Sequence, residues 1–189
     1  MGRSKDQTFG YDNVDYPVFD YLCEKYNVKS MVDIGCGWGG TVNYSIKKGV
    51  KSLGIDFSNK FNMFDKDEFV FHDYTTGKYI LDETYDLGWS VEFLEHVGEE
   101  YLDNIFSTLS CCKVVCCTHA LPNQSGVHHV NCRKPKYWID VFKKYGFRHD
   151  TRSSLYIKII SDMKDSRTSD LIFPYMKRTG MILISQNLI

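Results

Sequence analysis

The sequence predicts an α/β fold, a three-layer sandwich in which helices cover both faces of a mostly parallel sheet. The first observation is an alternation of short apolar runs with segments of helical periodicity, which is the order expected of strands joined by crossover helices. The second is the almost continuous apolar run at residues 113–118, which is typical of a strand buried on both faces of a parallel sheet.

Strands are expected where short apolar runs are bounded by polar residues or glycine. They are Ser30–Ile34, Lys51–Asp56, Glu68–His72, Tyr85–Ser90, Lys113–Thr118 and Gly180–Ser185. Helices are expected where apolar residues recur at helical spacing, namely after Pro17, over Thr41–Lys48 and around residues 101–109, 137–145 and 171–177. The pattern of Leu155–Ile160 fits a strand and a helix equally well.

Length and composition indicate one globular domain. The chain has 189 residues, of which 43% are hydrophobic and 25% are charged, and a chain of this size can bury a core of its own. The first residues are polar and charged. We therefore expect a flexible arm over residues 1–15 and a single domain over residues 16–189.

Charge and cysteine content favour a cytoplasmic protein without a membrane partner. The net charge of −1 gives no strongly basic surface, which disfavours a nucleic-acid partner. The seven cysteines include the adjacent pairs Cys111-Cys112 and Cys116-Cys117, which suits reduced thiols and not a disulfide framework. No apolar stretch reaches the roughly 20 residues of a membrane span. We expect a monomer or a homodimer.

A glycine-rich turn, Asp33-Ile34-Gly35-Cys36-Gly37-Trp38-Gly39-Gly40, joins the first strand to a helix. Its glycines allow a tight bend with a ligand lying against the backbone. The second strand ends at Asp56, whose carboxylate suits both hydroxyls of a ribose. Phe57 is placed to pack on adenine, and Asp73, after the third strand, to reach an adenine amino group. These residues predict a nucleoside-containing ligand.

The turn by itself leaves two ligand classes open. Gly35-x-Gly37-x-x-Gly40 also satisfies the dinucleotide fingerprint, so an NAD-binding domain is an alternative. Asp33 weighs against it, because a carboxylate beside the turn opposes a pyrophosphate and suits the ammonium of a methionine moiety.

Asp33-x-Gly35-x-Gly37-x-Gly39 resembles motif I of class I S-adenosylmethionine-dependent methyltransferases. The resemblance implies a Rossmann-like sheet of seven strands whose last strand is antiparallel. It also implies that the glycine turn binds the methionine part of S-adenosylmethionine, the second-strand acid the ribose and the third-strand acid the adenine. The residues expected at the cofactor are Asp33, Gly35, Cys36, Gly37, Asp56, Phe57, Asp73 and Ser90.

A second polar group follows the fourth strand, in Ser90-Val91-Glu92-Phe93-Leu94-Glu95-His96-Val97. If residues 92–96 form a helical turn, Glu92, Glu95 and His96 share one face. Two carboxylates and an imidazole on one face suit a divalent metal. The alternative is a structural role, in which a glutamate caps a helix and the histidine binds the backbone.

This segment resembles the equivalent stretch of ubiquinone-biosynthesis O-methyltransferases and of small-RNA 3′-terminal 2′-O-methyltransferases. In both groups a Glu-x-x-Glu-His segment is associated with magnesium or a similar ion, and the RNA enzymes add a histidine from a loop after the fifth strand. His128 and His129 lie in that loop here. The resemblance therefore implies a Mg²⁺ or Mn²⁺ site of Glu92, Glu95, His96 and His129. The pattern His128-His129-Val130-Asn131 also resembles small virus-encoded methyltransferases.

The function predicted from the sequence is methyl transfer from S-adenosylmethionine to a small-molecule or sugar hydroxyl, assisted by a metal. A metal bound to two neighbouring oxygens lowers the pKa of a hydroxyl. His128, His129 and Glu92 are the candidates for taking the proton. Two alternatives stay open: a ribose 2′-O-methyltransferase acting on an RNA end, and a non-catalytic module that only binds S-adenosylmethionine.

Overall fold

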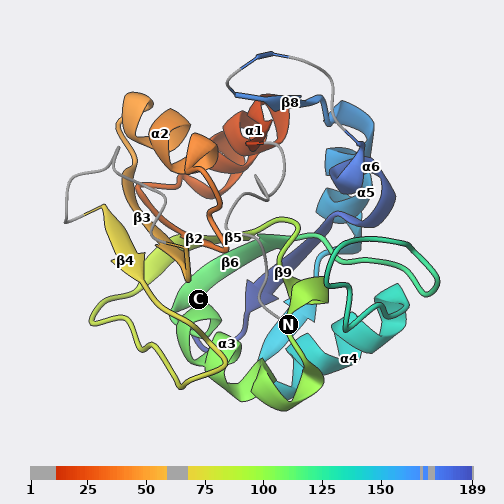
Figure 1. Cartoon of the computed structure of the whole chain (residues 1–189). Helices are drawn as coiled ribbons and strands as arrows, with labels where there is room; N and C mark the ends of the chain where they lie inside the picture. Colours follow the sequence, from red (N-terminus) through yellow and green to blue (C-terminus); the bar gives the residue numbers. More distant parts are fainter. Residues whose placement is uncertain (1–11, 59–67, 167, 170–172, 189) are drawn as a thin grey trace.

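The computed structural model describes residues 12–58, 68–166, 168–169 and 173–188, and its centre is a seven-stranded sheet (Figure 1). The strands of this sheet are β2 (Ser30–Ile34), β3 (Lys51–Asp56), β4 (Phe69–Phe71), β5 (Tyr85–Ser90), β6 (Cys112–Cys117), β7 (Phe147–His149) and β9 (Met181–Ser185). Their order is β4-β3-β2-β5-β6-β9-β7. Neighbours are parallel from β4 through β6, and β9 is antiparallel to β6 and β7. The predicted mostly parallel sheet with an antiparallel last strand is confirmed.

Helices cover both faces of the sheet (Figure 1). One face carries α1 (Tyr16–Tyr26), α2 (Gly40–Lys47), α5 (Thr151–Ile160) and α6 (Tyr175–Thr179), and the other carries α3 (Leu102–Leu109) and α4 (Pro135–Lys144). Met31 and Val32, adjacent on β2, belong to opposite hydrophobic cores, as the alternation of side chains along a strand requires. No helix in the described part of the chain is both long and apolar enough to cross a membrane.

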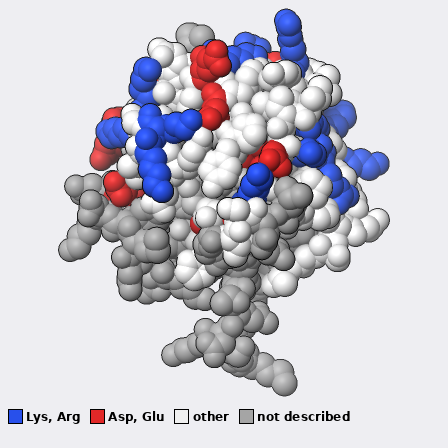
Figure 2. Space-filling view, turned by 90° about the horizontal axis from the view of Figure 1, so that it is seen from above, with Lys and Arg blue, Asp and Glu red and all other residues white. Residues whose placement is uncertain are grey.

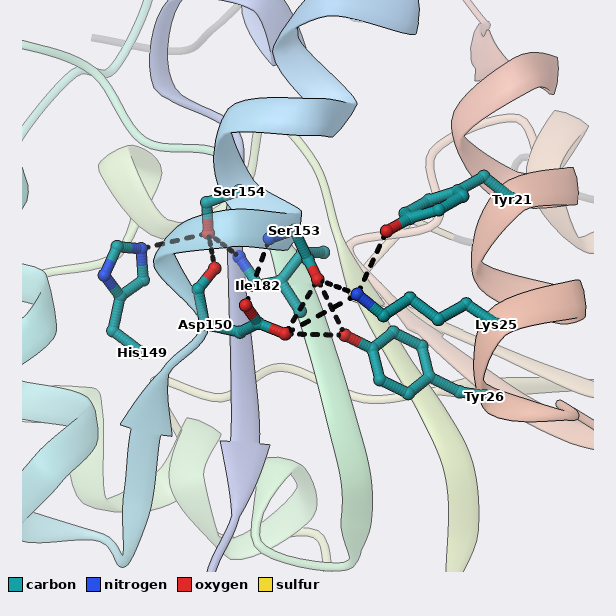
Figure 3. A network of polar contacts seen from close by, with 8 residues as sticks. All are labelled: Tyr21, Lys25, Tyr26, His149, Asp150, Ser153, Ser154 and Ile182. Carbon is teal, nitrogen blue, oxygen red and sulfur yellow. Dashed lines mark hydrogen bonds and ion pairs between the residues drawn. The ribbon is translucent and has the colours of Figure 1, made fainter.

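Leu155–Ile160, whose pattern fitted both a strand and a helix, lies in helix α5. A network of polar contacts holds this helix in position (Figure 3). Asp150 caps the helix, because its side chain accepts a hydrogen bond from the Ser153 amide at 3.0 Å. The other Asp150 oxygen accepts from the Tyr26 hydroxyl of α1 at 3.0 Å, and Lys25 donates to the Ser153 hydroxyl. The network joins α5 to α1, which lies on the same face of the sheet.

The predicted flexible arm, residues 1–15, is corrected for its last residues. Asn13–Asp15 form strand β1, which pairs in antiparallel fashion with β8 (Met163–Asp165) in a separate two-stranded sheet. Asp15 accepts hydrogen bonds from the Val18 amide at 3.3 Å and the Ser161 hydroxyl at 2.6 Å. These backbone and side-chain partners make residues 12–15 part of the domain, and residues 1–11 lie outside the described residues.

Candidate active site

A large cavity opens at the carboxyl ends of β2, β3 and β5, where ligands bind in open α/β sheets. Its volume is about 2020 Å³, compared with roughly 300–1,000 Å³ for an ordinary small-molecule pocket. The glycine turn lines one part of it, and the loop that carries His128 and His129 lines another. The cavity therefore has room for two ligands side by side.

The glycine turn has the backbone that its sequence predicts. Gly35, Gly37 and Gly39 have φ values of 75°, 54° and 76°, a left-handed region that side chains with a Cβ rarely adopt. A Cβ at Gly35 would also lie 2.4 Å from the Phe93 ring. Glycine at this position thus serves the packing of Phe93 as well as the bend.

A carboxylate from an earlier part of the chain lies at the N-terminus of α2, the helix that follows the turn. The Asp12 carboxylate accepts a hydrogen bond from the Gly40 amide at 2.8 Å. A dinucleotide would place its pyrophosphate at this helix end. Asp12 occupies the position with a negative charge, which weighs against the NAD alternative.

Asp33 lies buried at the cavity wall, with only 4% of its surface exposed. Burial raises the pKa of its carboxyl group well above the usual value, and the neighbouring carboxylates of Asp56 and Asp12 raise it further. No Lys or Arg of the described ranges forms an ion pair with Asp33. Three carboxylates at one wall give a site that favours a positively charged ligand.

Most of the other residues expected at the cofactor also line this cavity. The Asp56 carboxylate accepts hydrogen bonds from the Gly37 amide at 3.1 Å and the Ser58 amide at 2.8 Å. Asp73 is held in the same way by the Thr75 amide and hydroxyl. The remaining members of the lining set are Gly35, Cys36, Gly37 and Phe57. Ser90 is different, because it is fully buried and is not among the lining residues.

The polar residues after β5 lie near one another, but not through the helical turn that the sequence predicted for residues 92–96. Glu92 has a φ of 57° and lies outside the short 3-10 helix η1 (Leu94–His96), so the expected turn over residues 92–96 is wrong. One ligand atom from each of Glu95, His96 and His129 lies within 4.8 Å of the others. Glu92 is not in this set.

Glu95 is the buried centre of that set. Both of its carboxylate oxygens are buried without a hydrogen-bond partner among the described residues. Glu92 lies beside it and donates its backbone amide to the Thr118 hydroxyl at 2.9 Å. Burial raises the pKa of the Glu92 carboxyl group, and the neighbouring Glu95 carboxylate raises it further. A cation between the side chains would give the Glu95 oxygens a partner and would lower the raised pKa of Glu92.

The loop after β6 delivers His129 through contacts with η1. The amides of Val130 and Asn131 donate to the Glu95 carbonyl at 2.9 and 3.1 Å. The His129 Nδ1 lies 3.2 Å from the Gln124 carbonyl oxygen. Because a carbonyl oxygen can only accept, Nδ1 is the donor of this contact and Nε2 is the nitrogen available to a metal. A Cβ at Gly126 would lie 2.2 Å from His129 Nε2. Glycine at position 126 therefore leaves the space that the imidazole fills.

The two other histidines of this region take different places. His128 lines the cavity with a φ of 61° but is not in the close set with Glu95. His119 is buried outside the cavity lining, and burial lowers its pKa to about 4.

Sequence reasoning missed several residues that the fold brings to the cavity. Asp12 lies before the first predicted helix, and Phe173, Tyr175 and Arg178 lie near the C-terminus. No spacing rule connects these positions to the glycine turn. The one available signal was an aromatic and basic cluster within Phe173–Arg178.

The family model of mycolic acid cyclopropane synthetase matches residues 6–122, more than half of the 189 residues. The chain belongs to this family. The protein is an S-adenosylmethionine-dependent methyltransferase, and the predicted cofactor is confirmed. The match includes the glycine turn and Glu92–His96 and ends before His128 and His129.

Solved structures show the same fold at low sequence identity. The methyltransferase domain of bacterial CtHen1-CN has a TM-score of 0.55 and 17% identity, over 88% of this chain and 95% of that one. Magnesium protoporphyrin IX methyltransferase from Synechocystis PCC 6803, with bound SAH, has a TM-score of 0.59 and 16% identity, over 89% and 80%. A putative Haloferax volcanii methyltransferase in complex with the Trm112 activator has a TM-score of 0.60 and 12% identity, over 90% of both chains. No curated protein matches this methyltransferase. The resemblance to ubiquinone-biosynthesis and virus-encoded enzymes stays a prediction.

Proposed function

We propose that this methyltransferase methylates a hydroxyl of a small molecule, with a divalent cation held by Glu95, His96 and His129. The observation that carries the proposal is the buried Glu95 carboxylate, which has no hydrogen-bond partner among the described residues and lies against two imidazoles. An ionised carboxylate buried without a partner costs several kcal/mol. A cation is the partner that this set of donors fits.

The surroundings of the two histidines fit the same cation. A histidine that binds a metal through one nitrogen usually donates its other N–H to a carbonyl or carboxylate. His129 has the Gln124 carbonyl for this purpose at 3.2 Å, and backbone groups of His128 and Val127 bind the His96 ring. Two imidazole nitrogens with a carboxylate suit divalent transition metals, among which Mn²⁺ also accepts oxygen ligands, and Mg²⁺ prefers sites richer in oxygen.

Each bound group would supply one element of the chemistry. S-adenosylmethionine supplies a methyl group made electrophilic by the sulfonium. A divalent cation supplies positive charge that lowers the pKa of a hydroxyl next to it. The rest of the work is positioning, which accounts for a large part of the rate of such a displacement.

We assign one set of side chains to position the cofactor and another to position the acceptor. We assign Asp33 to the ammonium of the cofactor, Asp56 to its ribose and Asp73 to its adenine, with Gly35 and Gly37 against its methionine part. Glu92 lines the cavity next to Glu95. We assign it to accept the proton of the acceptor hydroxyl, because it is a carboxyl group of the cavity lining that lies beside the candidate cation site. His128 is the second candidate for this proton.

The charge distribution supports a small acceptor over an RNA end. The chain has 23 Lys and Arg against 24 Asp and Glu. On the face shown in Figure 2, the Lys and Arg side chains lie in separate groups with Asp and Glu between them. A protein that binds nucleic acid usually has a continuous basic patch, because phosphate contacts provide much of its affinity.

The test is transfer of a labelled methyl group from S-adenosylmethionine to catechol, ribose and adenosine, with Mn²⁺ or with EDTA. We expect labelled product from at least one of these diols with Mn²⁺, a loss of at least tenfold with EDTA, and a similar loss in His129→Ala. A His149→Ala variant, altered on the far strand β7, is the matched control. Labelling that is equally fast with EDTA and in His129→Ala would contradict the proposed role of the cation.

A further inference from the structure

Three large apolar side chains of the cavity lining face solvent. Val127, Val130 and Phe173 all line the cavity, yet they are 62%, 59% and 42% exposed. Large apolar side chains that remain exposed inside a concave site mark the place where a ligand covers them. Val127 and Val130 flank the histidine pair 128–129, so these two side chains lie next to the candidate cation site.

A guanidinium group of the cavity lining lies beside Phe173. Arg178 lines the cavity with its guanidinium carbon 5.0 Å from the centre of the Phe173 ring. No carboxylate of the described ranges forms an ion pair with it. The cavity's other arginine, Arg133, is already bound to Glu99 at 3.0 Å and to Asn131 at 3.2 Å. Among the described residues that line the cavity, Arg178 is therefore the arginine that can bind an anionic ligand.

The charges of the cavity give such a ligand one orientation. Asp12, Asp33 and Asp56 line the part that holds the glycine turn. An acidic group of the acceptor would be repelled there and attracted by Arg178. Arginine binds carboxylate and phosphate oxygens with two parallel hydrogen bonds, so the attraction also fixes geometry.

We propose that the acceptor is a small amphipathic acid: an apolar body contacts Val127, Val130 and Phe173, and a carboxylate or phosphate binds Arg178. This inference rests on the proposed function for the position of the reacting hydroxyl, which lies at the end of the acceptor away from the acid. The contact with Arg178 and Phe173 does not itself need the cation. The two can therefore be tested apart.

The test is calorimetric binding to the protein with S-adenosylhomocysteine and Mn²⁺ present. The first pair of probes is 3-(3,4-dihydroxyphenyl)propanoate and its primary amide. The second pair is 3-phenylpropanoate and its amide, which lack the hydroxyls. In each pair we expect the acid to bind about tenfold more tightly than the amide, because a hydrogen bond to a charged group is worth roughly that factor.

Three variants decide the outcome. Arg178→Met should bring the ratio of the two Kd values close to one, and Phe173→Ala should weaken acid and amide alike. Arg152→Met, altered on α5 outside the cavity lining, should leave the tenfold ratio unchanged. An acid that binds no better than its amide, or a ratio that survives Arg178→Met, overturns the inference. Preference for a short RNA over both acids also overturns it.

The second pair separates this inference from the proposed function. If the dihydroxy acid binds equally well with Mn²⁺ and with EDTA, the cation role is wrong. If 3-phenylpropanoate still loses its advantage in Arg178→Met, the acidic acceptor stands. If the diols are methylated with Mn²⁺ at a rate that does not change in Arg178→Met, the proposed function stands and the acidic acceptor is wrong.

Discussion

The Asp12 carboxylate accepts a hydrogen bond from the Gly40 amide at 2.8 Å, so the chain itself occupies the N-terminus of α2. Asp12 is held there from the other side by the Ser166 hydroxyl, which comes from the far end of the chain. The same carboxylate contributes to the raised pKa of Asp33. The contacts beside the short β1–β8 sheet thus hold a carboxylate at this end of the cavity, where it would repel a phosphate.

Replacing Asp12 by alanine removes both the cap of α2 and one of the three carboxylates. We expect Asp12→Ala to lower the free energy of unfolding by about 1 kcal/mol, the usual net contribution of one intramolecular hydrogen bond. Urea denaturation followed by circular dichroism measures the change. Asp140→Ala, which removes an exposed partner of Lys136 on α4, is the control. Equal urea midpoints for the two variants would show that the cap does not stabilise the fold.

Asp33→Asn should affect stability and cofactor binding in opposite directions. The ligand-free protein at neutral pH contains an acid whose ionisation is opposed by burial and by two carboxylates. The uncharged amide removes that cost, so the variant should be more stable than the wild type at pH 8. Its affinity for S-adenosylhomocysteine should fall by at least tenfold, because the ammonium loses a charged partner. Urea denaturation measures the change in stability, and titration calorimetry measures the change in affinity for S-adenosylhomocysteine.

The pH dependence of stability follows from the same raised pKa. A carboxyl group whose pKa is higher in the folded state stabilises the fold below its unfolded pKa of 3.8 and loses this contribution as the pH rises. The difference in unfolding free energy between Asp33→Asn and the wild type should therefore grow from pH 5 to pH 8. A constant difference across this range would mean that Asp33 ionises without cost.

Gly126→Ala should disturb the cation site and leave the cofactor site intact. Its Cβ would lie 2.2 Å from His129 Nε2, so the imidazole has to leave the position that it holds beside Glu95 and His96. We expect Mn²⁺ affinity to fall at least tenfold, the order found for displaced metal ligands and their supports. Gly77→Ala is the matched control, since a Cβ there meets nothing within 4 Å. Unchanged Mn²⁺ affinity in Gly126→Ala, measured by electron paramagnetic resonance, would exclude His129 as a ligand.

Glu92→Gln tests the assigned proton acceptor. The substitution keeps the shape of the side chain and removes its basicity, so methyl transfer to the best diol should fall by about 100-fold in kcat. Binding of S-adenosylhomocysteine should not change. A parallel His128→Asn variant distinguishes the second candidate. If only His128→Asn loses activity, Glu92 is a pocket-lining residue.

The parts of the fold that local patterns determine were predicted well. The bounds of β2, β3 and β5 agree with those expected from the sequence, because each is an apolar run that ends at a turn or a polar residue. The strand β7 was missed. It has only three residues and its middle residue, Arg148, is exposed, so it pairs with β9 without an apolar pattern of its own.

The candidate site was predictable where its residues follow one another in the chain or end a predicted strand, as Asp56 and Asp73 do. Asp33 and the glycines lie within one turn, and the resemblance of that turn assigned them together. The position of His129 depends on hydrogen bonds between a long loop and the Glu95 carbonyl, and such tertiary contacts leave no periodic signal. The same holds for Asp12 and Arg178, which reach the cavity from opposite ends of the chain.

A crystal structure with S-adenosylhomocysteine and Mn²⁺ tests the central claim most directly. The account predicts an anomalous peak between Glu95, His96 and His129, with the amino group of the bound product against Asp33 and its ribose on Asp56. A product bound at the glycine turn with no manganese density at those three side chains, under saturating Mn²⁺, would contradict the cation-assisted transfer to a hydroxyl.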